Sequence, residues 1–113
     1  MALLRGSIYL ADLSHKGGTE PGKARPVLVV QTDLLNQTGH PSTIVLPLTS
    51  RIVDDAEPLR VRVPDGLGLE APSDILIDQL RAVDNSRMLR LVATLSSDTL
   101  KTVELCLTVV LDI

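Results

Sequence analysis

The chain has 113 residues, 44% of them hydrophobic and 22% charged, values that exclude a disordered chain and fit one domain over residues 1–113. Eleven Lys and Arg against fourteen Asp and Glu give a net charge of −3, which argues against a generic nucleic-acid binder. One Tyr, with no Phe or Trp, also argues against RNA binding that depends on base stacking.

The cysteine count and the length of the apolar runs indicate whether disulfides, a zinc site or a membrane-spanning segment are expected. Cys106 is the single cysteine and cannot form an intramolecular disulfide, which favours a reducing cytoplasm. One Cys and two His are too few for a structural zinc site. No apolar run approaches ~18 residues, so we expect no membrane-spanning segment.

Short apolar segments, mostly with period-two alternation, predict six strands. In chain order they are residues 7–13, 27–30, 43–48, 59–63, 75–83 and 89–95. The second is apolar on both faces, which is typical of a central strand. In the third, Pro47 cannot donate a ladder hydrogen bond, so its end should lie at an edge or a bulge. In the fourth, Arg60 and Arg62 should point to solvent.

A helix is predicted at the end of the chain. Residues 96–98 combine a capping hydroxyl with an acidic first turn. Leu100, Val103, Leu107 and Val110 follow at helical spacing, and the helix is apolar nearly all round, so we expect it to be covered on more than one side. The residues thus predict a mainly β (α+β) chain, a barrel-like sheet with one C-terminal helix.

Two positions at strand ends are candidates for anion binding. Arg25 precedes the buried second strand, and its planar guanidinium matches phosphate oxygens. Thr49 ends the third strand and is followed by Ser50 and Arg51, which places two hydroxyls and a cation in a row. Spacing alone favours the simpler alternatives, in which Arg25 is a solvated arginine and Thr49 a turn residue.

Polar residues also interrupt the apolar 75–83 segment. Alternation along one strand would put Gln79 and Arg81 on one face and Asp78 on the other. They must be paired, solvated or exposed to a cleft, and the pattern leaves these open.

The Gly-rich segment 14–23 is predicted to be a binding loop. It contains Lys16 and Glu20, and Glu20 beside an arginine could accept a proton. The alternative for both residues is a solvated charge run. Cys106, inside the apolar helix, is expected to be a core residue.

Four segments, in order, resemble the MazF/PemK family of toxin endoribonucleases. They are residues 5–13 (RGSIYLADL), 20–30 (EPGKARPVLVV), 45–50 (VLPLTS) and 78–84 (DQLRAVD). The resemblance implies a small SH3-like barrel of the CcdB/Kid/MazF type, with a C-terminal helix and a tight homodimer. It also implies cleavage of single-stranded RNA without metal or other cofactor, by attack of the ribose 2′-hydroxyl on the adjacent phosphorus.

The resemblance also implies roles for particular residues. Arg25 would stabilise the phosphorane-like state and assist proton transfer, Thr49 would hold a phosphate oxygen, and Glu20 would act as general base or positioning group. The residues that would bind RNA are Lys16, Ser50, Arg51, Asp78, Gln79 and Arg81.

The arginines at positions 25, 51 and 81, contributed by two subunits, would make a basic groove inside a net-acidic dimer. The family's antitoxins cover this groove with a disordered, acidic C-terminal segment, which implies a MazE-like antitoxin as a partner.

Two other functions remain open on the same fold. Gyrase-poison toxins act through a C-terminal tail that contains Trp, whereas this chain has no Trp. A non-catalytic binding barrel would keep the scaffold without the chemistry.

Overall fold

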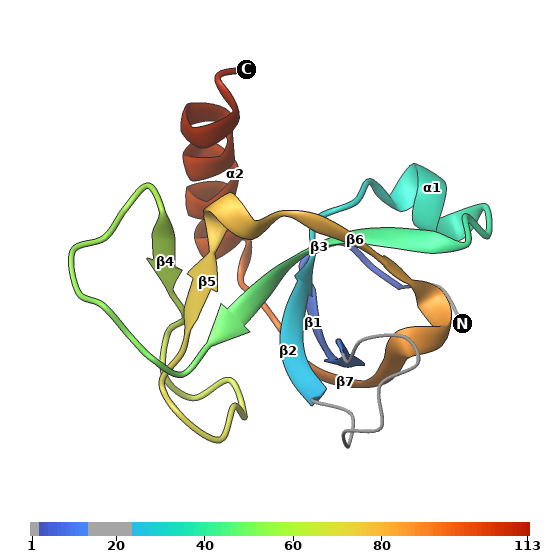
Figure 1. Ribbon diagram of the computed structural model, residues 1–113, viewed down its shortest axis with the longest axis horizontal. Coiled ribbons are helices and arrows are strands. Elements are labelled where there is room, and N and C mark those ends of the chain that lie inside the picture. The colour runs from blue at the N-terminus through green and yellow to red at the C-terminus, as the bar shows by residue number, and fades with distance from the viewer. Residues whose placement is uncertain (1–2, 14–23) are drawn as a thin grey trace.

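The computed structural model describes residues 3–13 and 24–113. They form an antiparallel sheet and a long helix at the end of the chain (Figure 1). The strands are β1 (Ser7–Asp12), β2 (Ala24–Val29), β3 (Ser42–Thr49), β4 (Arg60–Arg62), β5 (Asp74–Leu76), β6 (Arg81–Asp84) and β7 (Met88–Thr94). The helices are α1 (Asp33–Gln37) and α2 (Ser97–Leu111), with two 3₁₀ helices, η1 (Ile77–Gln79) and η2 (Asn85–Arg87). Within these described ranges, neither α-helix is long and apolar enough to cross a membrane.

The sheet has the order β4-β5-β3-β2-β1-β7, and β6 pairs with β3 beside β5. All pairings are antiparallel. Among the described strands, no pairing joins β7 to β4 or β6, so the curved sheet is a barrel that backbone hydrogen bonds do not close. The predicted mainly β fold with a barrel-like sheet and a C-terminal helix is confirmed.

The strand prediction is confirmed for five of the six segments, with ends displaced by up to three residues. The apolar 27–30 segment is the end of β2, which lies between β1 and β3 as expected for a central strand. The short helix α1 was not predicted. It begins after Thr32, whose side chain accepts a hydrogen bond from the Leu34 N–H at 3.3 Å.

The predicted strand over residues 75–83 is wrong, because the chain leaves the sheet in its middle. Leu48 pairs with Ile75, whereas Val45 pairs with Arg81. In an unbroken register Val45 would face Asp78. Three residues are therefore looped out of the ladder, and η1 contains three residues.

This break corrects one prediction and explains another. The expectation that Gln79 and Arg81 share a strand face, with Asp78 on the other, is wrong, because Asp78 and Gln79 lie in η1 and not in a strand. Pro47 of β3 lies where the neighbour changes from β6 to β5, so its missing N–H falls at an irregularity in the pairing, as expected.

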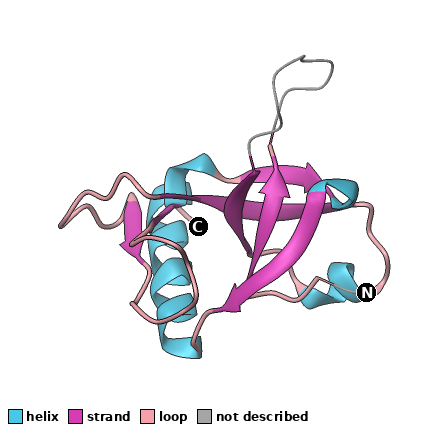
Figure 2. Cartoon of the chain, turned by 90° about the horizontal axis from the view of Figure 1, so that it is seen from below, coloured by secondary structure: helices cyan, strands magenta, loops and turns pink. Residues whose placement is uncertain are grey.

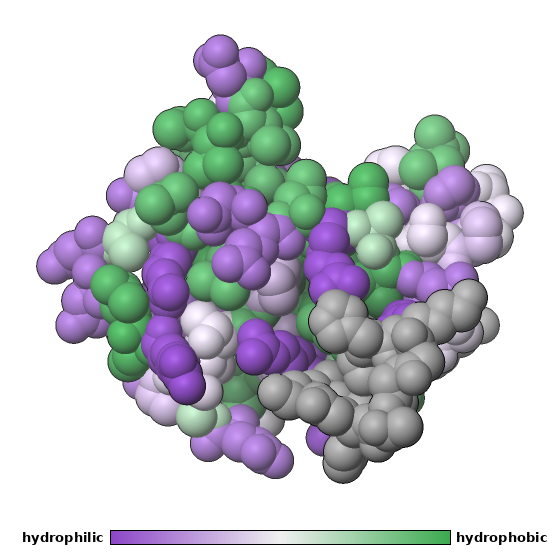
Figure 3. All heavy atoms as spheres, in the orientation of Figure 1, coloured by the Kyte–Doolittle hydropathy of each residue, from purple (hydrophilic) through white to green (hydrophobic). Residues whose placement is uncertain are grey.

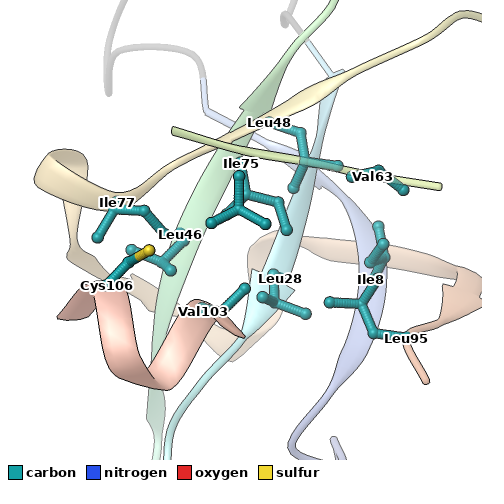
Figure 4. Packing of buried hydrophobic residues seen from close by; sticks show 11 residues of the cluster. Ile8, Leu28, Leu46, Leu48, Val63, Ile75, Ile77, Leu95, Val103 and Cys106 are labelled. Carbon is teal, nitrogen blue, oxygen red and sulfur yellow. The ribbon is translucent and has the colours of Figure 1, made fainter. Parts of the chain in front are cut away.

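Two apolar clusters lie on opposite faces of the sheet. The first includes Ile8, Leu28 and Leu46, which are level with each other across β1, β2 and β3 and fully buried (Figure 4). Helix α2 packs on this cluster with Val103 and Cys106 (Figure 4). The cartoon in Figure 2 shows this long helix beside the sheet. The second cluster, on the inner face of the curved sheet, includes Tyr9, Val27 and Val45.

Helix α2 starts where predicted, since Ser96 is its N-cap and accepts a hydrogen bond from the Thr99 N–H at 3.2 Å. Its buried residues are Val103 and Cys106. Cys106 is a core residue, as expected, and burial raises the pKa of its thiol.

The expectation that α2 is covered on more than one side is wrong for the single chain. Leu105, Val109 and Ile113 are 68%, 65% and 84% exposed. Apolar residues accordingly gather over α2 at the top of Figure 3.

Arg5, from the first of the four motif segments, stabilises the fold and does not line the cavity described below. Its guanidinium donates to the Val30 carbonyl at 3.0 Å and pairs with Glu104 of α2 at 2.8 Å. It thereby ties the ends of β1 and β2 to the helix.

Candidate active site

A cavity of about 820 Å³ lies at the ends of β2 and β3. Arg25, Thr49, Ser50 and Arg51 all contribute to its wall. Residues separated by more than twenty positions in the sequence are therefore brought to one hollow. The opposite wall comes from the segment between β4 and β5, including Glu70.

The strand register explains why Arg25 and Thr49 meet. Val27 pairs with Pro47, and Val29 pairs with Val45. Continued by two residues toward the cavity, this antiparallel register would bring Arg25 level with Thr49 on the same face. Directly opposed residues have Cβ atoms about 4.5–5.5 Å apart, so both side chains can reach one phosphate group.

The Thr49 hydroxyl is oriented by its own turn. Its Oγ1 accepts a hydrogen bond from the Arg51 N–H at 3.2 Å. A hydroxyl has one proton to donate besides its acceptor lone pairs. With an acceptor position already used, that proton is available for a ligand oxygen in the cavity.

The charge of the cavity differs in sign from that of the chain. Among the described residues, three arginines line it, Arg25, Arg51 and Arg90, against one carboxylate, Glu70. No ion pair joins these three guanidinium groups to another residue of the described chain. A concave surface with several unpaired guanidinium groups favours an anionic ligand such as a phosphodiester.

Two other arginines are held by a buried carboxylate instead. The Asp74 side chain is 1% exposed and pairs with Arg60 at 3.4 Å and with Arg62. The Val53 N–H also donates to it, at 2.8 Å. The expectation that both arginines simply point to solvent is therefore wrong, although each remains partly exposed.

The charge state of Asp74 follows from these bonds. Burial raises its pKa, but the hydrogen bonds from Arg62, the Val53 N–H and Arg60 outweigh this, and the pKa lies below its ordinary value. The bond to Asp74 likewise raises the pKa of Arg62. This group is an ionised structural network outside the cavity.

Three of the remaining predicted site residues, Asp78, Gln79 and Arg81, do not line the cavity. Asp78 and Gln79 lie on η1, and Arg81 lies at the start of β6. Arg81 pairs with Val45, four residues from Thr49, which corresponds to about 13 Å along β3. Glu20 and Lys16 fall in 14–23, outside the described residues.

Sequence reasoning missed two charged residues of the cavity. Arg90 fell only within the last predicted strand, and Glu70 lay between the predicted strands 59–63 and 75–83. An arginine in the middle of a strand does not by itself indicate a binding site, because its role depends on the residues that lie beside it on neighbouring strands. Among the described residues, no group of three or more His, Cys, Asp or Glu side chains could hold a metal ion.

The chain thus combines a small antiparallel β fold and a C-terminal helix with a cavity that Arg25 and Thr49 line at two strand ends. The chain belongs to the PemK-like, MazF-like toxins of type II toxin–antitoxin systems, whose family model matches residues 4–111. The family membership expected from the four motif segments is confirmed.

Curated relatives and solved structures agree with this assignment. Endoribonuclease EndoA of Bacillus subtilis is 39% identical over 89 residues, 78% of this chain and 76% of that protein. Endoribonuclease MazF of Staphylococcus saprophyticus is 37% identical over 100 residues, 88% and 82% of the two chains. A MazE–MazF crystal structure from Deinococcus radiodurans superposes with a TM-score of 0.83 at 26% identity and covers 100% of this chain and 98% of its own.

Proposed function

We propose that this protein is the toxin of a type II toxin–antitoxin system and a sequence-specific endoribonuclease that cleaves single-stranded RNA, mRNA above all, without a metal ion. The observation that carries the proposal is the cavity rich in arginine whose wall includes both Arg25 and Thr49, at neighbouring ends of β2 and β3. Curated relatives named as endoribonucleases support the reaction type.

The proposed reaction is an internal transesterification. The ribose 2′-oxygen forms a bond to the adjacent phosphorus, and the bond from phosphorus to the 5′-oxygen breaks. The products are a 2′,3′-cyclic phosphate and a 5′-hydroxyl end. One proton leaves the 2′-hydroxyl and one is delivered to the departing 5′-oxygen.

Each catalytic residue has a role suited to its chemistry. Arg25 neutralises the negative charge that builds up on the phosphorane-like state and assists proton transfer. Thr49 donates its hydroxyl proton to a phosphate oxygen. Glu20, by family position, takes the proton of the 2′-hydroxyl or positions the nucleophile.

The remaining predicted residues are proposed to bind RNA on either side of the reacting phosphate. Ser50 and Arg51, beside Thr49 in the cavity wall, suit the adjoining backbone. Asp78 and Gln79 in η1, Arg81 in β6, and Lys16 suit the flanking nucleotides.

We further propose a homodimer, a MazE-like antitoxin and a cytoplasmic location. The exposed apolar face of α2 supports association with a second copy. The Deinococcus radiodurans relative was crystallised as a MazE–MazF pair. An acidic antitoxin segment would complement the arginines of the cavity, and an mRNA substrate places the toxin in the cytoplasm.

Incubation of the purified chain with total RNA in EDTA, followed by mapping of the cleaved ends, tests the nuclease function. We expect cleavage at a short recurring sequence, with cyclic phosphate ends. Arg25→Ala and Thr49→Ala should each lower the rate by about 10²–10³-fold, whereas Thr94→Ala, at the far end of β7, should not.

The same preparation discriminates the alternatives. Intact RNA together with stalled gyrase would establish a gyrase poison. Intact RNA that is nevertheless bound would establish a non-catalytic barrel. Cleavage that Arg25→Ala does not reduce would contradict the assigned chemistry.

A further inference from the structure

A third arginine, on a strand that carries none of the predicted catalytic residues, faces the same cavity. Arg90 lies in β7, at the edge of the sheet, and contributes to the cavity wall together with Arg25 and Arg51. Its side chain makes no ion pair with the described residues. It is exposed, so it is available to a ligand.

The register fixes how far Arg90 lies from the reacting phosphate. Arg90 is level with Leu10 of β1, and Leu10 is level with Pro26 of β2. All three line the cavity. Pro26 follows Arg25 in the chain, so alternation puts Arg90 on the sheet face of Pro26, opposite the face that Arg25 and Thr49 share, and Arg90 borders the cavity from that side. Neighbouring strands are about 4.8 Å apart, so Arg90 stands about 10 Å across the sheet from β2.

This placement suits a neighbouring phosphate better than the scissile one. Thr49 and Arg25 already approach the reacting phosphate from β2 and β3, and Arg90 extends the positive charge across β1 to the sheet edge. A guanidinium donates several hydrogen bonds in a plane and matches the oxygens of a phosphodiester. The described part of the cavity wall carries three arginines and one carboxylate, which suits contacts to more than one phosphate.

We propose that Arg90 binds the RNA backbone at a phosphate adjoining the cleaved one and so sets the direction in which the strand crosses the sheet, from β3 toward β7. This inference rests on the proposed ribonuclease function. Arg90 acts in substrate binding and not in the chemical step, because its strand position keeps it from the scissile phosphate that Arg25 and Thr49 hold.

The variant Arg90→Gln tests this, since it removes the charge and keeps an unbranched, polar side chain. With an RNA that carries one mapped cleavage site, we expect KM to rise about five- to tenfold with kcat unchanged. Arg90→Lys should fall between wild type and Arg90→Gln. The matched control is Lys101→Gln, which removes an exposed cation of α2 outside the cavity.

A binding readout independent of cleavage completes the test. The probe is a short, fluorescein-labelled 2′-O-methyl RNA pool of random sequence, which lacks the attacking hydroxyl. One phosphate contact contributes about 0.7 to the slope of log K against log salt for a single strand. Arg90→Gln should reduce the slope by about that amount, and Lys101→Gln should leave it unchanged.

The outcomes separate the two proposals. A wild-type chain that cleaves RNA, with Arg90→Gln matching it in KM and salt slope, overturns only the role of Arg90. Loss of kcat with KM unchanged, or weaker binding of an acidic peptide without any change toward RNA, overturns it too. A wild-type chain that neither cleaves RNA nor binds the pool overturns both.

Discussion

Asp74 shows how one buried carboxylate determines which arginines remain available for a ligand. Its two oxygens form ion pairs with Arg60 and Arg62 and accept a hydrogen bond from the Val53 N–H. These guanidinium groups are thus held in the protein framework, while those of the cavity are left to a ligand. The sequence alone does not distinguish arginines that pair with a carboxylate from arginines that face a cavity. That difference becomes visible only from the contacts in the structure.

The lowered pKa of Asp74 predicts a pH dependence of stability. A carboxyl whose pKa is lower in the folded chain than in the unfolded one stabilises the fold above the unfolded value, about 3.9. That stabilisation is lost as the pH falls through the folded value. Asp74→Asn should lower the free energy of unfolding at neutral pH by about 1–3 kcal/mol and should flatten its decline in acid.

Denaturant unfolding over a pH series measures both effects. Asp54→Asn is the matched control, because Asp54 also pairs with Arg62, at 2.8 Å, but is 82% exposed. Equal effects of the two substitutions would show that burial of Asp74 does not strengthen its interactions.

Among the elements, α2 begins at a cap that can be tested separately from its packing. Ser96 accepts a hydrogen bond from the Thr99 N–H, and Ser97 is the first residue of the helix. Ser96→Ala should cost about 1 kcal/mol of unfolding free energy, and Ser97→Ala, one position later, should cost much less. Thermal unfolding compares the two, and equal losses would contradict the assigned cap.

Strands with a simple alternation or a fully apolar core segment could be predicted from the sequence, as β1, β2 and β3 were. The break at η1 could not. Ile75, Leu76 and Ile77 are all buried, so they give no alternation from which to locate the end of a strand. The loop out of the ladder depends instead on β3, whose partner changes beside Pro47.

The candidate site was predictable to a similar extent. Arg25 and Thr49 stand out by their positions at strand ends and by their motif segments, and the cavity brings them together. Arg90 and Glu70 could not be found, because their significance arises from strands and loops that meet only in three dimensions. The sequence around each residue does not indicate which strands pair or in what register.

At the scale of the whole molecule, α2 is covered on one side by the core and exposes apolar residues on another. Leu105 and Val109 are one helical turn apart and more than 60% exposed. The proposed homodimer would bury them, so Leu105→Glu combined with Val109→Glu should convert a dimer to a monomer.

Sedimentation velocity provides the measurement. Leu34→Glu is the control, since Leu34 on α1 is 72% exposed and lies outside α2. A chain that remains dimeric with both glutamates in α2 would place the interface elsewhere on the surface.

The alignment of β2 with β3 has a consequence for how mutations can inactivate this molecule. A shift of one residue between two strands reverses which side of the sheet every side chain occupies. An insertion or deletion between Val27 and Arg25 would therefore turn the guanidinium away from Thr49, even in a chain that still folds and retains both groups. The proposed activity thus depends on the number of residues between Arg25 and the apolar part of β2, besides the identity of the residues that line the cavity.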